Sequence, residues 1–292
     1  MSHAGAPVGG LLVLVDPVAR RLDGESVRIA KDVLSAGAAA KICLPDSPEE
    51  FARALARRGH RQPVIVGDDR ALVRAVGLLH RERTLSGAVV SLIPVGQPGS
   101  LALARLLGVP LSAVSAARAV LDGTVGLRDL LVDDSDGVVL GGLSIPPVRA
   151  VPRPAGPSVW SAYRSLVRTL VRPPAGEGPG GATGAAGTGH RLRVEADGVV
   201  LADVDRLVED VSVTPRDGAW EGARDGGGDG LAEVVVRMGT GPGSVVRTRA
   251  AAVTVSGADF RYRADAAVTG PVRRRTWTLR PAAWALTLPH QR

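Results

Sequence analysis

The chain has 292 residues and is poor in cysteine, lysine and aromatic side chains. Its one cysteine, Cys43, excludes an intramolecular disulfide and a cysteine-based zinc site, and we expect it in the core rather than as a nucleophile. The only lysines, Lys31 and Lys41, lie in neither a Gly-Lys-Ser/Thr nor a Val-Ala-x-Lys sequence, which excludes a P-loop and the protein-kinase lysine. Aromatic residues make up 3% of the chain and do not alternate with arginines, which argues against a stacking platform for single-stranded nucleic acid.

No apolar run in the sequence approaches the roughly 20 residues of a membrane-spanning helix, so the sequence predicts no such helix. The N-terminus has no basic segment of the kind that opens a signal peptide, so we expect a cytoplasmic protein. Its net charge of +7 comes almost entirely from arginine in a chain rich in Ala, Gly and Val. That bias is typical of a source with skewed base composition and is weak evidence for a nucleic-acid partner. Peripheral attachment to the anionic inner membrane surface fits the charge.

The first half of the chain alternates strands with helices. Ser47, Pro48 and Glu50 mark one helix start, with a capping hydroxyl, a proline in the first turn and a glutamate three residues after the cap. Such short alternating units predict an α/β domain with a doubly wound parallel sheet. We expect strands at 10–16, 39–44, 63–67 and 88–95, and helices at 25–36, 47–58, 70–81, 99–107 and 110–122.

The second half favours an antiparallel β-rich domain, with strands separated by glycine-rich turns. A helix at 158–171 and a flexible Gly/Ala/Pro-rich loop at 172–190 precede most of these strands. The expected domains are 1–145 and 146–292. Asp225 and Asp229 fit no EF-hand spacing and indicate a solvated turn. Strand-like runs occupy 192–201, 211–213, 231–236, 245–255 and 274–287.

Two turns follow neighbouring strands of the predicted parallel sheet. The first is Gly67-Asp68-Asp69-Arg70-Ala71, and the second is Gly96-Gln97-Pro98-Gly99-Ser100. Ligand sites in such sheets lie where strand ends meet helix N-termini, because the amides there are unpaired and attract phosphate. We therefore expect the two turns side by side at the carboxyl edge of the sheet. A purely structural alternative makes Asp68 or Asp69 a helix N-cap, leaves Arg70 in solvent and gives Ser100 a capping role.

These motifs together resemble the catalytic domain of the diacylglycerol kinase family. That family carries G-G-D-G-T after its third strand and P-x-G-T-x-N-D-x-A-R-x-L-G-[IVL]-P after its fourth, where this chain has the two turns and the run 104–110, Ala-Arg-Leu-Leu-Gly-Val-Pro. Leu11 to Pro17 resembles the family's first strand and turn, Arg263 to Ala267 aligns with D-G-E, and 279–286 looks like the terminal P-x-A-L strand. The resemblance implies an α/β nucleotide domain followed by a β-rich domain, and transfer of the ATP γ-phosphate to a lipid hydroxyl with magnesium.

The resemblance also implies roles for individual residues. Gly67 and Gly96 are the remaining phosphate-turn glycines, and Asp69 is the metal- or nucleotide-facing acid. Asp265 stands at the position of the catalytic base.

The same alignment shows where the chain departs from the family. Asp68 and Arg70 replace glycines that let the backbone approach phosphate. Asp68 would repel a triphosphate unless a metal ion or Arg70, a potential bidentate phosphate donor, offsets its charge. Ala267 replaces the family's glutamate, which weakens a metal site.

Two readings of function, and a weaker third, follow. The first is a lipid kinase acting on a diacylglycerol or related lipid at a membrane surface. The second is a catalytically impaired relative that binds a nucleotide, lipid or protein partner as a regulator. A basic regulator that contacts nucleic acid is the third and least favoured reading. The oligomeric state stays open, a homo-oligomer included.

Overall fold

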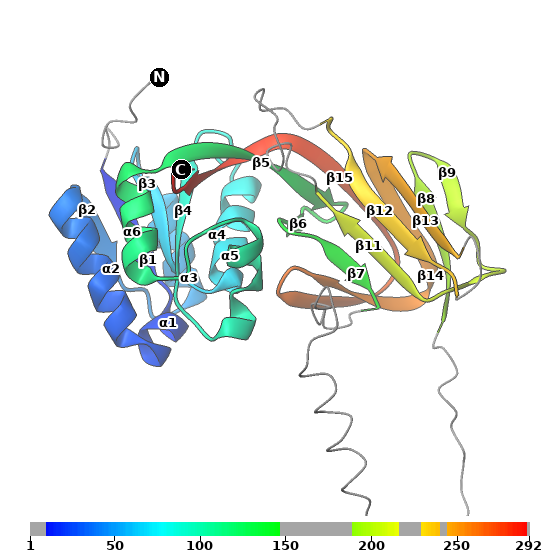
Figure 1. Cartoon of the computed structure of the whole chain (residues 1–292), viewed down its shortest axis with the longest axis horizontal. Helices are drawn as coiled ribbons and strands as arrows, with labels where there is room; N and C mark the ends of the chain where they lie inside the picture. Colours follow the sequence, from blue (N-terminus) through cyan, green and yellow to red (C-terminus); the bar gives the residue numbers. More distant parts are fainter. Residues whose placement is uncertain (1–9, 147–188, 216–228, 240–243, 291–292) are drawn as a thin grey trace, which may run out of the picture. The chain divides into compact units, whose positions relative to one another are not determined.

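The computed structural model describes residues 10–146, 189–215, 229–239 and 244–290, which belong to one compact unit of the chain (Figure 1). The helix expected at 158–171, nearly all of the loop expected at 172–190, and Asp225 lie outside the described residues. The boundary expected at residue 145 between two domains stays a prediction.

Four parallel strands form the sheet of the first half, as predicted. They are β1 (Leu11–Val15), β2 (Ala40–Cys43), β3 (Gln62–Gly67) and β4 (Val89–Pro94). Their order is β2-β1-β3-β4, and every neighbouring pair is parallel. Along the chain, β2 is added on one side of β1, and β3 and then β4 are added on the other side. The point of reversal lies between the carboxyl ends of β1 and β3, which is where open α/β sheets bind ligands.

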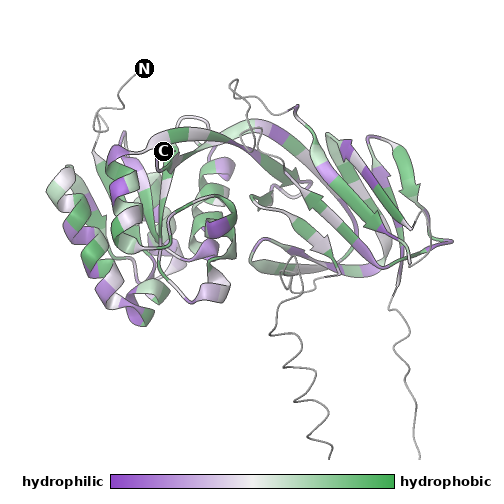
Figure 2. Ribbon diagram, viewed as in Figure 1, coloured by the Kyte–Doolittle hydropathy of each residue, from purple (hydrophilic) through white to green (hydrophobic). Residues whose placement is uncertain are grey.

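Helices cover both faces of this sheet, which confirms the doubly wound fold (Figure 1). The first set of helices is α1 (Pro17–Leu22), α2 (Gly24–Gly37) and α6 (Ala113–Asp122), and the second is α3 (Pro48–Ala56), α4 (Asp69–Arg81) and α5 (Ala102–Leu106). Leu11, Val13 and Val15 share a core with the first set, whereas Leu12 and Leu14 share a core with the second. The alternation follows from the two-residue period of a strand. Figure 2 shows the resulting pattern, with largely hydrophobic strands and hydrophilic stretches on the helices.

Helix starts follow the capping residues. The predicted cap at Ser47 is confirmed, because its Oγ accepts the Glu50 amide at 3.2 Å. Helix α1 was not expected: Asp16 accepts the Val18 amide at 2.8 Å, and Pro17 occupies the first helical position. The single helix expected over 99–107 is instead a 3₁₀ turn, η1 (Pro98–Ser100), followed by α5.

The remaining strands are mostly antiparallel, as predicted for the β-rich part. Two expected strands are in fact pairs of strands. Asp197 and Gly198 both have positive φ and turn the run 192–201 into a β8–β9 hairpin, while the run 245–255 is divided at Ala251. The strands are β5 (Thr124–Asp133), β6 (Val138–Val139), β7 (Leu143–Ile145), β8 (His190–Ala196), β9 (Val199–Ala202), β10 (Leu207–Val208), β11 (Asp210–Thr214), β12 (Ala232–Arg237), β13 (Val245–Ala250), β14 (Ala252–Ala264) and β15 (Ala267–Leu288).

Strand β15 joins the two kinds of sheet. It has 22 residues and pairs antiparallel with β14 and β5, and its end pairs in parallel with β4. Three polar side chains hydrogen-bond to one another at this junction. Ser91 Oγ donates to Thr287 Oγ1 at 2.8 Å, and the Gln62 side-chain amide donates to Ser91 Oγ at 3.1 Å and to Thr287 Oγ1 at 3.0 Å. The last strand of the chain therefore completes the parallel sheet that carries the two turns.

Candidate functional site

The two predicted turns lie side by side at the carboxyl edge of the parallel sheet. The Val95 amide donates to the Gly67 carbonyl at 2.9 Å. A Cβ placed on Gly96 would lie 3.3 Å from the Asp68 Cβ and 2.7 Å from Ser100 Oγ, and one on Gly67 would lie 3.0 Å from the Asp16 Cβ. Close packing thus accounts for both glycines. Their expected contact with phosphate stays a prediction.

Asp68 caps helix α4. Its Oδ1 accepts the amides of Arg70 and Ala71 at 3.1 and 3.2 Å, which is the structural alternative that the sequence left open. These amides are also the ones that would bind an anion at the start of α4. The carboxylate therefore occupies a position that a phosphate would need. Arg70 is exposed and makes no ion pair with any residue in the described ranges.

Asp69 is buried, with 2% of its surface exposed, and points toward α5 rather than toward solvent. Its Oδ2 accepts the Leu103 amide at 2.8 Å, and its Oδ1 accepts the Ala104 amide at 2.9 Å. Burial raises the pKa of this carboxyl, and these amides partly offset that effect. The capping role expected of Ser100 is wrong, because its Oγ donates to the Gln97 carbonyl at 3.0 Å while Asp69 satisfies the α5 amides. This geometry gives no support to Asp69 as a metal ligand.

An ion pair that the sequence did not indicate lies at the reversal point of the sheet. Arg74 Nη1 lies 3.0 Å from Asp16 Oδ2, and its guanidinium carbon lies 5.8 Å from the centre of the Phe51 ring. Asp16 is 4% exposed and uses its other oxygen to cap α1. The sequence offered one indication that Arg74 lies near the first turn: it follows Arg70 by one helical turn and so lies on the same face of α4.

Asp265 lies in the tight turn between β14 and β15, with a φ of 47°. Its Oδ2 accepts the Leu140 amide at 2.8 Å, and its Oδ1 accepts the amides of Gly141 and Gly142 at 2.7 and 3.1 Å. Burial raises its pKa to about 6, against the lowering effect of the three amides, and the nearby Asp69 carboxylate adds to the rise. The residue is nevertheless partly exposed, and Oδ2 accepts one hydrogen bond where a carboxylate oxygen can accept two.

A short series of contacts connects Asp69 with Asp265. Asp69 holds the amide of Leu103, and a Cβ placed on Gly141 would lie 2.6 Å from Leu103 Cδ1 and 3.2 Å from Asp265 Oδ1. Gly141 in turn donates its amide to Asp265. The structure therefore brings together Asp69, from the first predicted turn, and Asp265, from the predicted base position.

The acids at this edge differ in their capacity to bind a metal ion. Within the described ranges, no three histidine, cysteine or acidic side chains are grouped as a metal site. Both oxygens of Asp16 and of Asp69 are engaged, whereas Asp68 Oδ2 makes no hydrogen bond to the described part of the chain. Magnesium usually takes one or two carboxylates together with waters and substrate phosphates. Of Asp16, Asp68 and Asp69, Asp68 alone has a carboxylate oxygen without a hydrogen bond to the described part of the chain.

Comparison with solved structures identifies the fold. One structure described as "a putative diacylglycerol kinase" from Bacillus anthracis str. Sterne aligns with a TM-score of 0.67 at 14% identity, over 99% of this chain and 98% of that chain. This chain has a diacylglycerol kinase fold. Two further structures, a second so described and one described as a diacylglycerol kinase, both from the same organism, have TM-scores of 0.66 and 0.64 at 13% and 12% identity, each covering 95% of this chain and 96% of the other.

The fold resemblance inferred from the sequence is thereby confirmed over nearly the whole chain. No protein-family model matches the sequence, and no curated protein matches it. Among the described helices, none is long and apolar enough to cross a membrane.

The contacts of Asp69 predict a stability effect that distinguishes it from Asp68. Asp69→Asn places an NH₂ group among the amides of α5, and leaving a buried donor unsatisfied costs about 1–3 kcal/mol. Asp68→Asn is the matched control, because asparagine caps a helix about as well as aspartate. Urea unfolding at neutral pH should show a clear loss of stability in the first variant and little change in the second. Equal losses in both would contradict the role of Asp69 in holding α5.

Proposed function

We propose that this protein transfers the γ-phosphoryl group of ATP to the hydroxyl of a diacylglycerol or a related lipid. The diacylglycerol kinase fold supports the reaction class. The observation that carries the proposal is the geometry of Asp265, a partly exposed carboxyl that three backbone amides hold in the β14–β15 turn, with an acceptor position left on Oδ2. Burial also raises its pKa to about 6. A general base works best when its pKa is close to the operating pH, and strongly shifted carboxyls gather at functional sites.

In the proposed reaction the lipid hydroxyl oxygen attacks the γ-phosphorus, the bond from that phosphorus to the bridging oxygen breaks, and ADP leaves. Asp265 Oδ2 takes the hydroxyl proton, since this oxygen has an acceptor position beyond the Leu140 amide. The amides of 140–142 keep the carboxylate in one orientation throughout. Gly67, Gly96 and Arg70 are proposed to face the nucleotide phosphates.

Magnesium is the ion that the fold's known members suggest, and the residue proposed for it from the sequence does not fit. Asp69 has both oxygens on backbone amides and is buried. Asp68 Oδ2 fits better, but one carboxylate oxygen does not make a site of its own. We therefore derive no step through the metal, and the proposed chemistry rests on Asp265.

A lipid acceptor would bring the protein to a membrane surface. The net charge of +7 supports attraction to an anionic inner leaflet. The acceptor lipid, the nucleotide and this peripheral attachment belong to the same proposal.

Asp265→Asn should abolish most of the transfer of labelled phosphate from ATP to diacylglycerol, because loss of a general base typically costs about 10²–10⁴-fold in rate. In the wild type the rate should fall as the pH drops below about 6, since protonation of Asp265 removes the base. The chain offers a matched control in Asp197, which also has a φ of 47° and accepts the amides of Ala251 and Ala252 at 3.0 and 2.8 Å. Asp197→Asn should keep full activity.

Comparable activity in the Asp265→Asn and Asp197→Asn proteins would remove Asp265 from the mechanism. Urea unfolding of both variants shows whether either loss of activity comes from loss of folded protein.

A second candidate function is favoured by one specific observation, the occupation of the α4 amides by Asp68. A carboxylate in this place competes with phosphate and repels it. This observation supports a non-catalytic relative that binds a nucleotide weakly, or binds a lipid alone, and acts as a regulator.

The double variant Asp68→Gly with Arg70→Gly restores the glycines and separates the two candidates. If Asp68 blocks the turn, calorimetric titration should show tighter binding of Mg-ATP to this variant than to the wild type. Asp68→Asn with Arg70→Gln is the control, because it changes charge but keeps side chains in place. Unchanged binding would contradict a block by Asp68, and weaker binding would mean that Asp68 and Arg70 form part of the binding site.

A further inference from the structure

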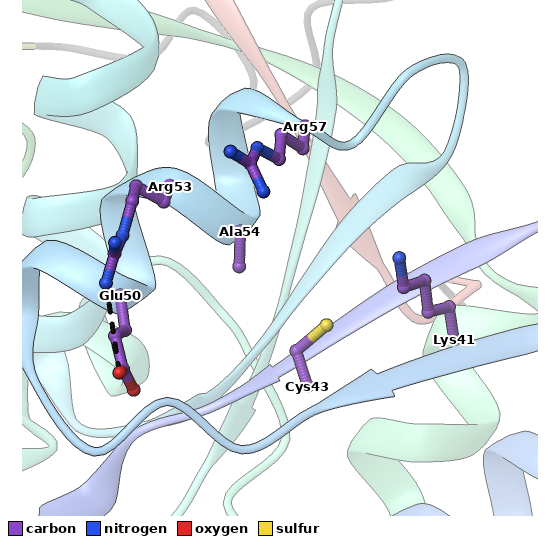
Figure 3. A pocket seen from close by; sticks show the side chains of 6 residues that line it. All are labelled: Lys41, Cys43, Glu50, Arg53, Ala54 and Arg57. Atoms are coloured by element: carbon purple, nitrogen blue, oxygen red, sulfur yellow. Dashed lines mark ion pairs between the residues drawn. The ribbon is translucent and has the colours of Figure 1, made fainter.

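A hollow with a basic lining lies between strand β2 and helix α3, apart from the turns described above (Figure 3). Its volume is about 270 Å³, and its lining residues are Lys41, Cys43, Glu50, Arg53, Ala54 and Arg57. We call it the β2–α3 hollow. Three of these six side chains are cationic and one is acidic, so the lining carries an excess of positive charge.

The positive charge is only partly neutralised within the protein. Arg53 lies 3.8 Å from Glu50, one turn away on the same helix. Lys41 and Arg57 make no ion pair with any residue in the described ranges, although they lie on the two elements that face each other across the hollow (Figure 3). Cations near the end of a helix are stabilised by its dipole, which accounts for Arg57 but not for Lys41 on the opposite strand.

Lys41 and Arg57 are exposed and line one hollow, so an anion that enters it meets positive charge from both β2 and the end of α3. Arginine and lysine both bind phosphate, arginine through two parallel N–H donors and lysine as a compact charge. Ala54 and Cys43 add a small apolar surface between the cations. The volume of about 270 Å³ is just below the roughly 300–1,000 Å³ of typical ligand pockets, so it suits a small ligand.

We propose that the β2–α3 hollow binds a phosphate group, carried either by a small soluble phosphate ester or by a phospholipid headgroup. Lys41 and Arg57 hold the phosphate, and Cys43 lies beside it. This site is independent of the proposed kinase reaction, because none of its lining residues takes part in the turns or in the Asp265 contacts.

Cys43 supplies a direct reporter, because it is the chain's only cysteine and is partly exposed. The experiment measures the rate of its alkylation by the neutral reagent iodoacetamide, by mass spectrometry of the intact protein. Glycerol 3-phosphate, pyrophosphate and phosphatidate-containing vesicles are compared with sodium chloride of equal ionic strength and with phosphatidylcholine vesicles. Phosphate compounds should slow the alkylation several-fold and saturably. Protection by the soluble compounds identifies a soluble ester, and protection by phosphatidate vesicles alone identifies a headgroup.

The variant Lys41→Gln with Arg57→Gln should lose this protection. Lys31→Gln with Arg81→Gln is the matched control, since Lys31 is the only other lysine and Arg81, like Arg57, lies at the end of a helix. It should be protected like the wild type. Absence of protection in the wild type, equal protection by chloride, or equal protection in both double variants would overturn the proposal.

Discussion

Carboxylates that accept backbone amides organise the loops around the carboxyl edge of the parallel sheet. Asp16 holds the start of α1, Asp68 the start of α4 and Asp69 the start of α5, while Asp265 holds the loop at 140–142. Each replaces capping or ladder hydrogen bonds that these short segments lack. Because a buried amide without a partner is costly, removing one of these acids disturbs a loop as well as a charge.

This arrangement limits what the same acids can do chemically. A carboxylate with both oxygens on amides, such as Asp69, is a poor metal ligand, and Asp68 competes with phosphate for the amides that it caps. Asp265 also has both oxygens on amides but differs from Asp69 in being partly exposed, and burial together with the neighbouring charge of Asp69 raises its pKa to about 6. Asp265 is for this reason the acid proposed to transfer a proton, at an edge where the other acids hold backbone amides.

Asp69 and Asp265 are coupled through packing. Asp69 positions Leu103, whose side chain lies against Gly141, and Gly141 binds Asp265. A change at Asp69 would thus alter the surroundings of Asp265 by moving α5 as well as by removing charge. Through these contacts Asp69, although buried, lies next to the surroundings of Asp265.

The sequence was sufficient to predict the α/β architecture, because the first four strands are short apolar runs with clear turn and cap residues between them. It also predicted that the Gly67 and Gly96 turns meet. Longer-range contacts were beyond it: Asp69 binds amides 34 and 35 residues away, and Asp265 binds amides more than 120 residues away. Local pattern instead suggested Ser100 as the cap of α5. The division of 192–201 into two strands was missed because apolar residues continue on both sides of the Asp197-Gly198 turn, so the segment looks like one strand.

The central claim is that Asp265 is a carboxyl held by the 140–142 amides and titrating near neutrality. Amide proton and nitrogen NMR shifts of Gly141 and Gly142 test it directly, because protonation of the acceptor changes both. We predict a transition at a pH of about 6 in the wild type that is absent from the Asp265→Asn protein. Shifts that stay flat across this range, or that change only near the ordinary aspartate pKa of about 3.9, would contradict the account.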